Sequence, residues 1–320
     1  MVGLAEIKAA RETIVDFTRR TPLLSSPSLS KSIGTNVWFK AECLQRTGSF
    51  KPRGATNKIK SLVGQKIGGV LTVSSGNHGL ATAYVAGRLG IPAVILVPEG
   101  TAQVKIDAAR GYGAEVIIGG SLNNVEPLME KAYAMCAEKN FVPIHPFDDP
   151  LILAGQGTIG LEILEDLPDV DIVIVPVGGG GLLGGIAVAL KESRPKVKVY
   201  GVGPVNASAM YTGLHEKKVV TLHDDMAQSV AEALRSPIIS EATLEIAMKY
   251  VEDIILLTDA EVVEAMKLVW NRTKLIVEPS GVASFAAVIS GKVTRSGKAK
   301  IACVLSGGNV DLAKAAKYLS

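Results

Sequence analysis

The sequence predicts an α/β protein of two three-layer α/β/α lobes with mostly parallel sheets. Short apolar runs recur along the 320-residue chain, and segments with helical periodicity follow them. Runs of this kind that alternate with helices are typical of parallel strands covered on both faces. The chain is 48% hydrophobic but only 5% aromatic, and it has 33 glycines, a composition that suits helices packed closely on such sheets.

The expected elements form two series. In the first, the strands are 69–73, 93–97 and 114–118, and the helices are 81–90, about 101–110 and about 121–137. In the second, the strands are 171–177, 197–202, 254–256 or slightly longer, and 299–305. HPFDDP at 145–150 separates the two series, and its prolines indicate a crossing point. We therefore expect a small α/β domain at 69–147 and a large one built from 1–68 and 148–320.

Composition and charge argue against several classes of protein. The net charge is +3 without a basic stripe, so we expect no nucleic-acid partner. No apolar run approaches the roughly 18 residues of a membrane-spanning helix, and residues 1–17 are too charged for a signal peptide. Cys43, Cys136 and Cys303 share no metal-ligand spacing, so neither a metal site nor a disulfide framework is expected. These observations favour a cytoplasmic protein without a membrane partner.

The segment SFKPRGA at 49–55 places a lysine at a predicted helix start. Pro52 suits the first turn of a helix, so Lys51 comes just before or at that start. The positive end of the helix dipole disfavours a protonated amine there and favours a nucleophilic one. By itself, the segment also fits a surface lysine beside a capping serine.

The segment SSGNHG at 74–79 lies between a predicted strand and a predicted helix. Its backbone N–H groups and small hydroxyls would converge on one point and could bind a carboxylate. Asn77 offers both a donor and an acceptor, whereas His78 has no partner histidine nearby and fits orientation or packing better than metal binding. An ordinary capped turn explains the segment equally well.

Four consecutive glycines follow the predicted strand at 171–177 and precede a helix. Bare backbone at a helix N-terminus lets a phosphate approach the amides closely, so phosphate binding is favoured over close packing alone. Gly179, Gly181 and Gly184 also have the spacing of a dinucleotide fingerprint. However, the next strand ends in VYGVGPVN without the acidic residue that would bind a ribose.

The segment SGGN at 306–309 follows the last predicted strand. The hydroxyl of Ser306, held in a glycine turn, could contact a heterocyclic nitrogen without charging it. A plain glycine-rich turn is the alternative for this segment alone.

Together these segments resemble pyridoxal-phosphate enzymes of fold type II, which have a tryptophan synthase β-like fold, and in particular the threonine dehydratase and serine racemase family. The matching segments keep the family's order over nearly the whole chain: TPLL 21–24, SFKPRGA 49–55, SSGNHG 74–79, AGQGTIGLEIL 154–164, GGGGL 178–182, EPSG 278–281 and SGGN 306–309. Pro52 departs from SFKDRG, which resembles threonine synthases, and from SVKDR, which resembles cysteine synthases. The chain ends soon after SGGN, so we expect no regulatory domain like that of biosynthetic threonine dehydratases.

The resemblance implies a role for each segment. Lys51 would carry pyridoxal 5′-phosphate, with Phe50 beside its ring, and Glu278 would lie near the ring. Asn77 would bind the cofactor's ring hydroxyl, and Ser306 would bind its ring nitrogen. The phosphate would be bound by Gly178, Gly179, Gly180, Gly181 and Leu182. The substrate carboxylate would be bound by Ser74, Ser75, Gly76, Asn77 and His78. The family also implies a homodimer or homotetramer.

The implied reaction eliminates water from a small β-hydroxy amino acid such as L-threonine or L-serine. Lys51 would remove the Cα proton, and the product would hydrolyse to a 2-oxo acid and ammonia. Serine racemisation with side dehydratase activity is the main alternative, because Ser75 stands where threonine dehydratases have alanine and serine racemases have serine. A catalytically silent protein that binds an amino acid or the cofactor is a further alternative, but the retained site residues argue against it. A nucleotide-dependent oxidoreductase is another, and the missing ribose-binding acidic residue argues against it.

Two segments depart from the family's patterns. Residues 203–209 read GPVNASA, where the divalent-metal site of eukaryotic racemases has acidic ligands in an EPSNADD-like stretch. We therefore expect no metal at that position. TLHDDMAQ at 221–228 replaces the usual TIADGIAV, with His223, Asp225 and Gln228 as the unusual residues. This difference leaves open a less common substrate such as hydroxyaspartate or phenylserine.

Overall fold

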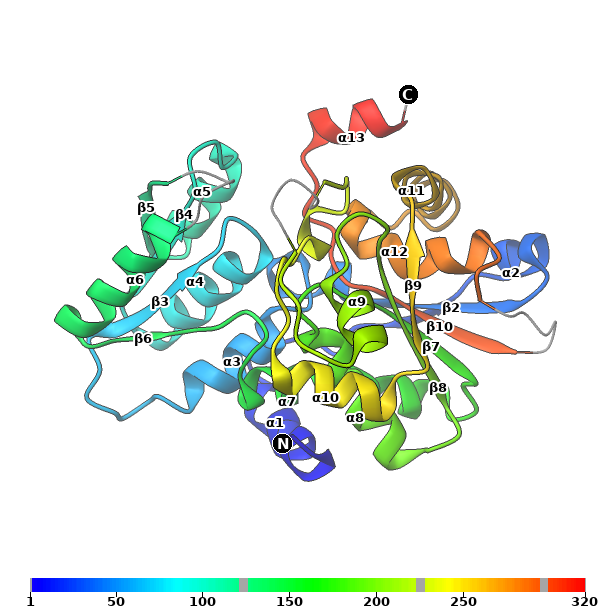
Figure 1. Ribbon diagram of the computed structural model, residues 1–320, viewed down its shortest axis with the longest axis horizontal. Helices are drawn as coiled ribbons and strands as arrows, with labels where there is room; N and C mark the ends of the chain where they lie inside the picture. The colour runs from blue at the N-terminus through cyan, green and yellow to red at the C-terminus, as the bar shows by residue number, and fades with distance from the viewer. Residues whose placement is uncertain (1, 121–125, 223–227, 294–298, 320) are drawn as a thin grey trace.

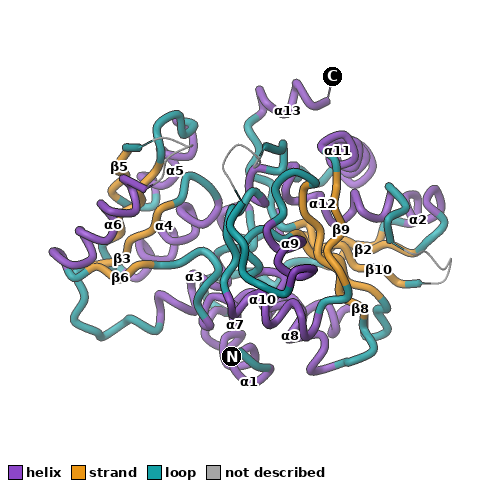
Figure 2. Tube along the Cα trace, viewed as in Figure 1, coloured by secondary structure: helices purple, strands orange, loops and turns teal. Residues whose placement is uncertain are grey.

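The computed structural model describes residues 2–120, 126–222, 228–293 and 299–319. Its strands form one sheet of four and one of six, and every strand pair except one is parallel (Figure 1). Figure 2 shows the two groups of strands apart from each other, each accompanied by helices. The predicted α/β class with mostly parallel sheets is confirmed. In the described part of the chain, no helix is both long and apolar enough to cross a membrane.

The four-stranded sheet has the order β5-β4-β3-β6. Its strands are β3 (Gly69–Val73), β4 (Ala93–Val97), β5 (Glu115–Ile118) and β6 (Phe141–Pro143), and its helices are α4 (Asn77–Leu89), α5 (Gln103–Gly111) and α6 (Glu126–Lys139). The first three strands follow the prediction, whereas β6, with only three residues, was not predicted. Helix α4 begins four residues earlier than expected, so Asn77 and His78 form its first turn.

The six-stranded sheet has the order β1-β2-β10-β7-β8-β9, with β1 antiparallel to β2. Its strands are β1 (Leu23–Ser25), β2 (Asn36–Ala41), β7 (Ile172–Pro176), β8 (Lys198–Pro204), β9 (Asp253–Leu257) and β10 (Lys300–Leu305). The last four confirm the prediction. Strand β2 was missed because NVWFKA mixes polar and apolar residues, yet it pairs with β10 over six residues inside the sheet.

Helices cover both faces of the six-stranded sheet. The helices outside the four-stranded sheet are α1 (Leu4–Ile14), α2 (Pro27–Ile33), α3 (Pro52–Lys60), α7 (Pro150–Asp166), α8 (Gly181–Ser193), α9 (Ala209–Glu216), α10 (Glu241–Tyr250), α11 (Asp259–Thr273), α12 (Pro279–Ile289) and α13 (Leu312–Leu319). Alternate residues of the six-stranded sheet point to opposite cores: Ile174 and Cys303 lie with α11 and α12, while Val173 and Val304 lie with α7 and α8. Short 3₁₀ turns lie at Glu42–Leu44, Arg46–Gly48 and Glu232–Leu234.

Helix α7 packs closely between α3 and α8 through glycines. A Cβ added to Gly155 would lie 2.5 Å from the carbonyl oxygen of Arg53 in α3. A Cβ added to Gly185 of α8 would lie 2.3 Å from the carbonyl oxygen of Leu153 in α7. Only glycine permits these approaches. Because α3 follows Lys51 and α8 begins at the last of the four glycines, the small residues of α7 determine how far apart those two segments lie.

Candidate active site

The segments singled out in the sequence lie at the carboxyl ends of strands. Residues 74–79 follow β3, the four glycines follow β7 by one residue, and Ser306 follows β10 directly. Ligand sites of parallel α/β sheets lie beyond this edge.

Lys51 caps the N-terminus of α3, as the sequence predicted. Its Nζ donates a 2.9 Å hydrogen bond to the carbonyl oxygen of Pro146 and lies 5.1 Å from the centroid of the Phe50 ring. Burial lowers the pKa of this amine to about 8. Near pH 7 the Lys51 amine is therefore neutral in a much larger fraction of molecules than an exposed lysine would be. A neutral amine can act as a nucleophile or a base.

The backbone before Lys51 pairs with the segment after β10. Phe50 N–H donates to the carbonyl oxygen of Ser306 (3.1 Å), and Gly308 N–H donates to that of Gly48 (2.9 Å). These bonds bring Lys51 next to SGGN although the two are some 250 residues apart in the chain. Ser306 is buried, and its hydroxyl forms no hydrogen bond with any residue that the structure describes. It therefore remains available to a ligand.

Asn77 is held by two side chains from the six-stranded sheet's half of the molecule. Its Nδ2 donates to Glu278 (2.7 Å), and its Oδ1 accepts from Asn309 Nδ2 (2.8 Å). One N–H of Nδ2 stays available for a ligand. Burial raises the pKa of Glu278 to about 7, against the opposing effect of the hydrogen bond from Asn77. Asn309, the last residue of SGGN, had no role predicted from the sequence and contributes here by positioning Asn77.

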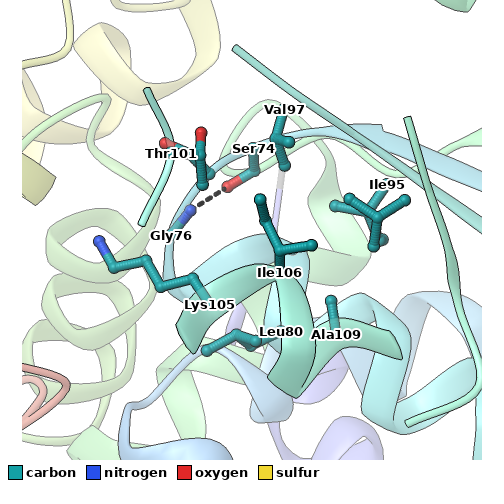
Figure 3. Close-up of a pocket in the computed structure, with 12 residues that line it drawn as sticks. Ser74, Gly76, Leu80, Ile95, Val97, Thr101, Lys105, Ile106 and Ala109 are labelled. Carbon is teal, nitrogen blue, oxygen red and sulfur yellow. Dashed lines mark hydrogen bonds between the residues drawn. The ribbon is translucent and has the colours of Figure 1, made fainter. Parts of the chain in front are cut away.

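The segment 74–79 presents free donors at the start of α4. The N–H groups of residues 77–79 donate no hydrogen bond to the described part of the chain. Ser74 and Ser75 line a small pocket together with Gly76 and with residues of α5, including Lys105 (Figure 3). Ser75 also forms no hydrogen bond with described residues. This arrangement can bind a carboxylate.

His78 is buried, and its ring is engaged with the backbone. Its Nε2 lies 2.9 Å from the carbonyl oxygen of Ile144, and because a carbonyl only accepts, the ring nitrogen must donate. Burial, reinforced by the charge of Lys51, lowers the pKa of His78 to about 3. The side chain is therefore neutral at physiological pH and fits the orienting role expected from the sequence.

The four glycines form a loop whose amides are unpaired. Gly180 has a φ of +98°, a left-handed conformation that favours glycine, and it caps α8. The N–H groups of residues 178–183 donate no hydrogen bond to any described residue, although residues 179–183 are buried. Buried donors of this kind require an acceptor, and at a helix N-terminus an anion is favoured. The loop thus fits a phosphate group.

Two residues missed by the sequence analysis connect Lys51 with the glycine loop. Pro146 accepts the hydrogen bond of Lys51, and the next residue, Phe147, packs on the loop. A Cβ added to Gly179 would lie 2.2 Å from the Phe147 ring, and one added to Gly181 would lie 2.8 Å from Phe147 Cβ. Since the same dipeptide touches both, the amine of Lys51 and the free amides lie at one site.

Comparison with known proteins identifies the family of this site. A family described as pyridoxal-phosphate dependent enzymes matches residues 14–307. The chain belongs to this family. It is therefore an enzyme that depends on pyridoxal phosphate, and the donors just described fit that cofactor: an amine of lowered pKa for the aldehyde and unpaired amides for the phosphate.

Several relatives are similar over almost their full lengths. The catabolic L-threonine dehydratase of Staphylococcus aureus is 41% identical over 319 residues, which cover 98% of this chain and 91% of that protein. Threonine deaminase isoform 2 of Solanum lycopersicum is 33% identical, with a TM-score of 0.92 and coverage of 98% and 91%. Maize serine racemase is 34% identical, with a TM-score of 0.91 and coverage of 99% and 96%.

Not every prediction can be placed. His223 and Asp225, the unusual residues of TLHDDMAQ, lie outside the described residues. Among the described residues, no three His, Cys, Asp or Glu side chains are grouped so that they could hold a metal ion. The Cys43, Cys136 and Cys303 thiols are free.

Proposed function

We propose that this enzyme is a dehydratase of the ammonia-lyase type, which eliminates water from a small β-hydroxy amino acid such as L-threonine or L-serine to give a 2-oxo acid and ammonia. The supporting observation is that Pro146 accepts the hydrogen bond of the Lys51 amine while the next residue, Phe147, packs on the glycine loop. These two contacts bring to one site the groups that would hold the two ends of the cofactor. Names of relatives support the same reaction, since threonine dehydratase and threonine deaminase are among them.

We assign the residues that would hold the cofactor from the donors and acceptors they offer. Lys51 would bind its aldehyde, with Phe50 beside the ring, and Ser306 would meet the ring nitrogen. The remaining N–H of Asn77 would donate to the ring hydroxyl. The hydrogen bond that Asn77 donates to Glu278 and the one that it accepts from Asn309 support this position. The phosphate would be bound by the amides of Gly178, Gly179, Gly180, Gly181 and Leu182.

When bound, the cofactor withdraws electrons from the substrate's α-carbon and so acidifies its proton. Lys51 Nζ would accept that proton, because burial gives it a pKa of about 8 and hence a substantial neutral fraction near pH 7. The free amides at the start of α4, together with Ser74 and Ser75, would bind the substrate carboxylate. Neutral His78 would hold this segment against the carbonyl of Ile144 without adding charge.

Serine racemisation is the second candidate. Inverting the α-carbon requires an acid–base group on the face opposite Lys51, and the Ser75 hydroxyl is unengaged by the described residues and lies in the segment assigned to the substrate. Chiral analysis of the amino acid recovered from L-serine separates the two activities. If Ser75 serves racemisation, Ser75→Ala abolishes inversion while sparing elimination; D-serine formed at an unchanged rate by the variant excludes this role.

The decisive experiment tests cofactor attachment and reaction together. Purified protein supplied with pyridoxal phosphate should be yellow, and borohydride reduction followed by peptide mapping should find the cofactor on Lys51. A panel of hydroxy amino acids, including L-threonine, L-serine and hydroxyaspartate, is then scored for 2-oxo acid and ammonia. Attachment at another lysine, or no 2-oxo acid from any member, would refute the proposal.

We further propose a cytoplasmic homodimer or homotetramer. This proposal rests on the family resemblance of the sequence. We also propose that 69–147 forms a domain distinct from 1–68 with 148–320, because all strands of the four-stranded sheet fall within the first range. Light scattering of the eluting protein would measure the mass of the assembly.

A further inference from the structure

Four buried charged side chains lie beside the segment that carries Lys51. They are Lys40 (0% exposed), Glu42 (0%), Arg53 (1%) and Glu162 (6%). Two are cationic and two anionic, so the cluster is neutral overall. It joins three parts of the fold, because Lys40 is on β2, Glu42 directly follows β2, Arg53 is on α3 and Glu162 is on α7.

Arg53 is the centre of this cluster. Its Nε and one terminal nitrogen donate to the two oxygens of Glu42 (2.9 and 2.8 Å). Its two terminal nitrogens also donate to the two oxygens of Glu162 (2.7 and 2.9 Å), and one of them to Thr158 Oγ1 (3.0 Å). The guanidinium is thus held in a fork on two sides, a geometry that lysine cannot reproduce.

Lys40 belongs to the cluster but forms no hydrogen bond with the described residues of α3. Its Nζ donates to Glu162 and, at 2.7 Å, to the carbonyl oxygen of Thr21. It therefore balances the charge of Glu162 without a hydrogen bond to the helix that begins beside Lys51. This difference provides a matched control for any role of Arg53.

Stability alone is a weak reason for such a cluster. Desolvating four charges costs free energy that their attraction only partly returns, and apolar replacements of buried ion pairs are often at least as stable. What a fully bonded buried network does supply is one defined arrangement of the elements it joins. Arg53 lies in the first turn of α3, two residues after Lys51, so this arrangement includes the direction of the Lys51 side chain.

We propose that Glu42, just after β2, and Glu162, on α7, position Lys51 for cofactor attachment through their hydrogen bonds with Arg53. Arg53 is a positioning residue here, because it acts through the start of α3. Without the hydrogen bonds between Arg53 and the two carboxylates, the first turn of α3 can rotate or unwind. The Lys51 amine then loses its hydrogen bond to the carbonyl oxygen of Pro146. The inference rests on the proposed role of Lys51 as the attachment site.

The test compares Arg53→Lys with the control Lys40→Met in full-length protein freed of cofactor. Two quantities are measured: the rate at which added pyridoxal phosphate is captured, followed by absorbance, and the pH dependence of Lys51 labelling by an acylating reagent, followed by mass spectrometry. We expect Arg53→Lys to slow capture at least about tenfold and to move the midpoint of Lys51 labelling to higher pH, as the amine becomes solvated. Lys40→Met should change both by less than about twofold, whatever its melting temperature.

Each other outcome is informative. Equal slowing in both variants, or unchanged capture and labelling in folded Arg53→Lys, overturns the inference. If Arg53→Lys does not fold, Glu42→Gln weakens the hydrogen bonds on one side of Arg53 while keeping the shape of the side chain. This variant should slow cofactor capture by a smaller factor. Unchanged capture again overturns the inference. Borohydride mapping of every variant separates the two proposals, because cofactor found on a lysine other than Lys51 in the unmodified protein refutes the proposed site itself.

Discussion

The side-chain amide of Asn77 donates a 2.7 Å hydrogen bond to the carboxyl group of Glu278, across 201 residues of chain. Burial raises the pKa of Glu278 to about 7 in spite of this bond. Near neutral pH the carboxyl is therefore partly protonated and can either accept or donate a proton within the site. This pair connects α4 of the four-stranded sheet with the start of α12 under the six-stranded sheet.

Glu278 should make the cofactor-free protein less stable as pH rises. Its folded pKa of about 7 exceeds the ordinary value of 4.5, so between these values the folded state binds more protons than the unfolded state. The free energy of unfolding therefore falls from pH 4.5 to pH 7 through this group. Glu278→Gln removes the effect and should be more stable than the unmodified protein at pH 8 by about 3 kcal/mol, but not at pH 4.5. Urea titrations at both pH values measure this difference; an equal effect at both would show that the charge of Glu278 is not involved.

Lys51 should behave in the complementary way. Its folded pKa of about 8 lies below the ordinary 10.5, so the folded state is penalised while the amine is charged, and stability rises as pH increases from 8 to 10.5. Lys51→Met should thus stabilise the cofactor-free protein at pH 7 by about 3 kcal/mol. It should also abolish the yellow colour and lower 2-oxo acid formation by at least about a thousandfold. A variant that keeps its colour after dialysis would contradict the assignment of Lys51.

Much of this fold follows from patterns within single segments. Strands such as 69–73 and 93–97 have the predicted bounds because a buried parallel strand is a continuous apolar run. Strand β6 has only three residues, and β2 mixes polar with apolar ones, so neither has a strong local pattern. Periodicity could not find them.

The site shows the same division. Lys51, the glycine loop and Ser306 have local signatures, and the structure brings their segments together. Pro146 and Phe147 have no local signature in the sequence, because a carbonyl oxygen and an aromatic ring become part of the site only through contacts with distant segments. The partners of Arg53 are also distant, since Glu162 lies 109 residues away in the chain.

Ser306 should determine what happens after the α-proton is removed. A neutral hydroxyl leaves the ring nitrogen mostly uncharged, which weakens electron withdrawal and favours prompt loss of the β-hydroxyl. Ser306→Asp should charge that nitrogen and increase transamination relative to elimination. The ratio of the cofactor's amine form to ammonia released from L-serine measures this partition. An unchanged ratio in a variant that still binds cofactor would argue against contact between Ser306 and the ring nitrogen.

Gly179 and Phe147 should be coupled energetically. A Cβ at Gly179 would lie 2.2 Å from the Phe147 ring, so Gly179→Ala must displace the ring and should cost about 1–3 kcal/mol of stability. Phe147→Ala alone should cost about 1–2 kcal/mol, because it removes the packing of a partly buried ring. In the double variant the added methyl group occupies vacated space, so the total cost should be less than the sum by at least about 1 kcal/mol. Urea unfolding of the four proteins without cofactor gives this coupling energy. Additive costs would mean that the ring does not pack on the glycine loop in solution.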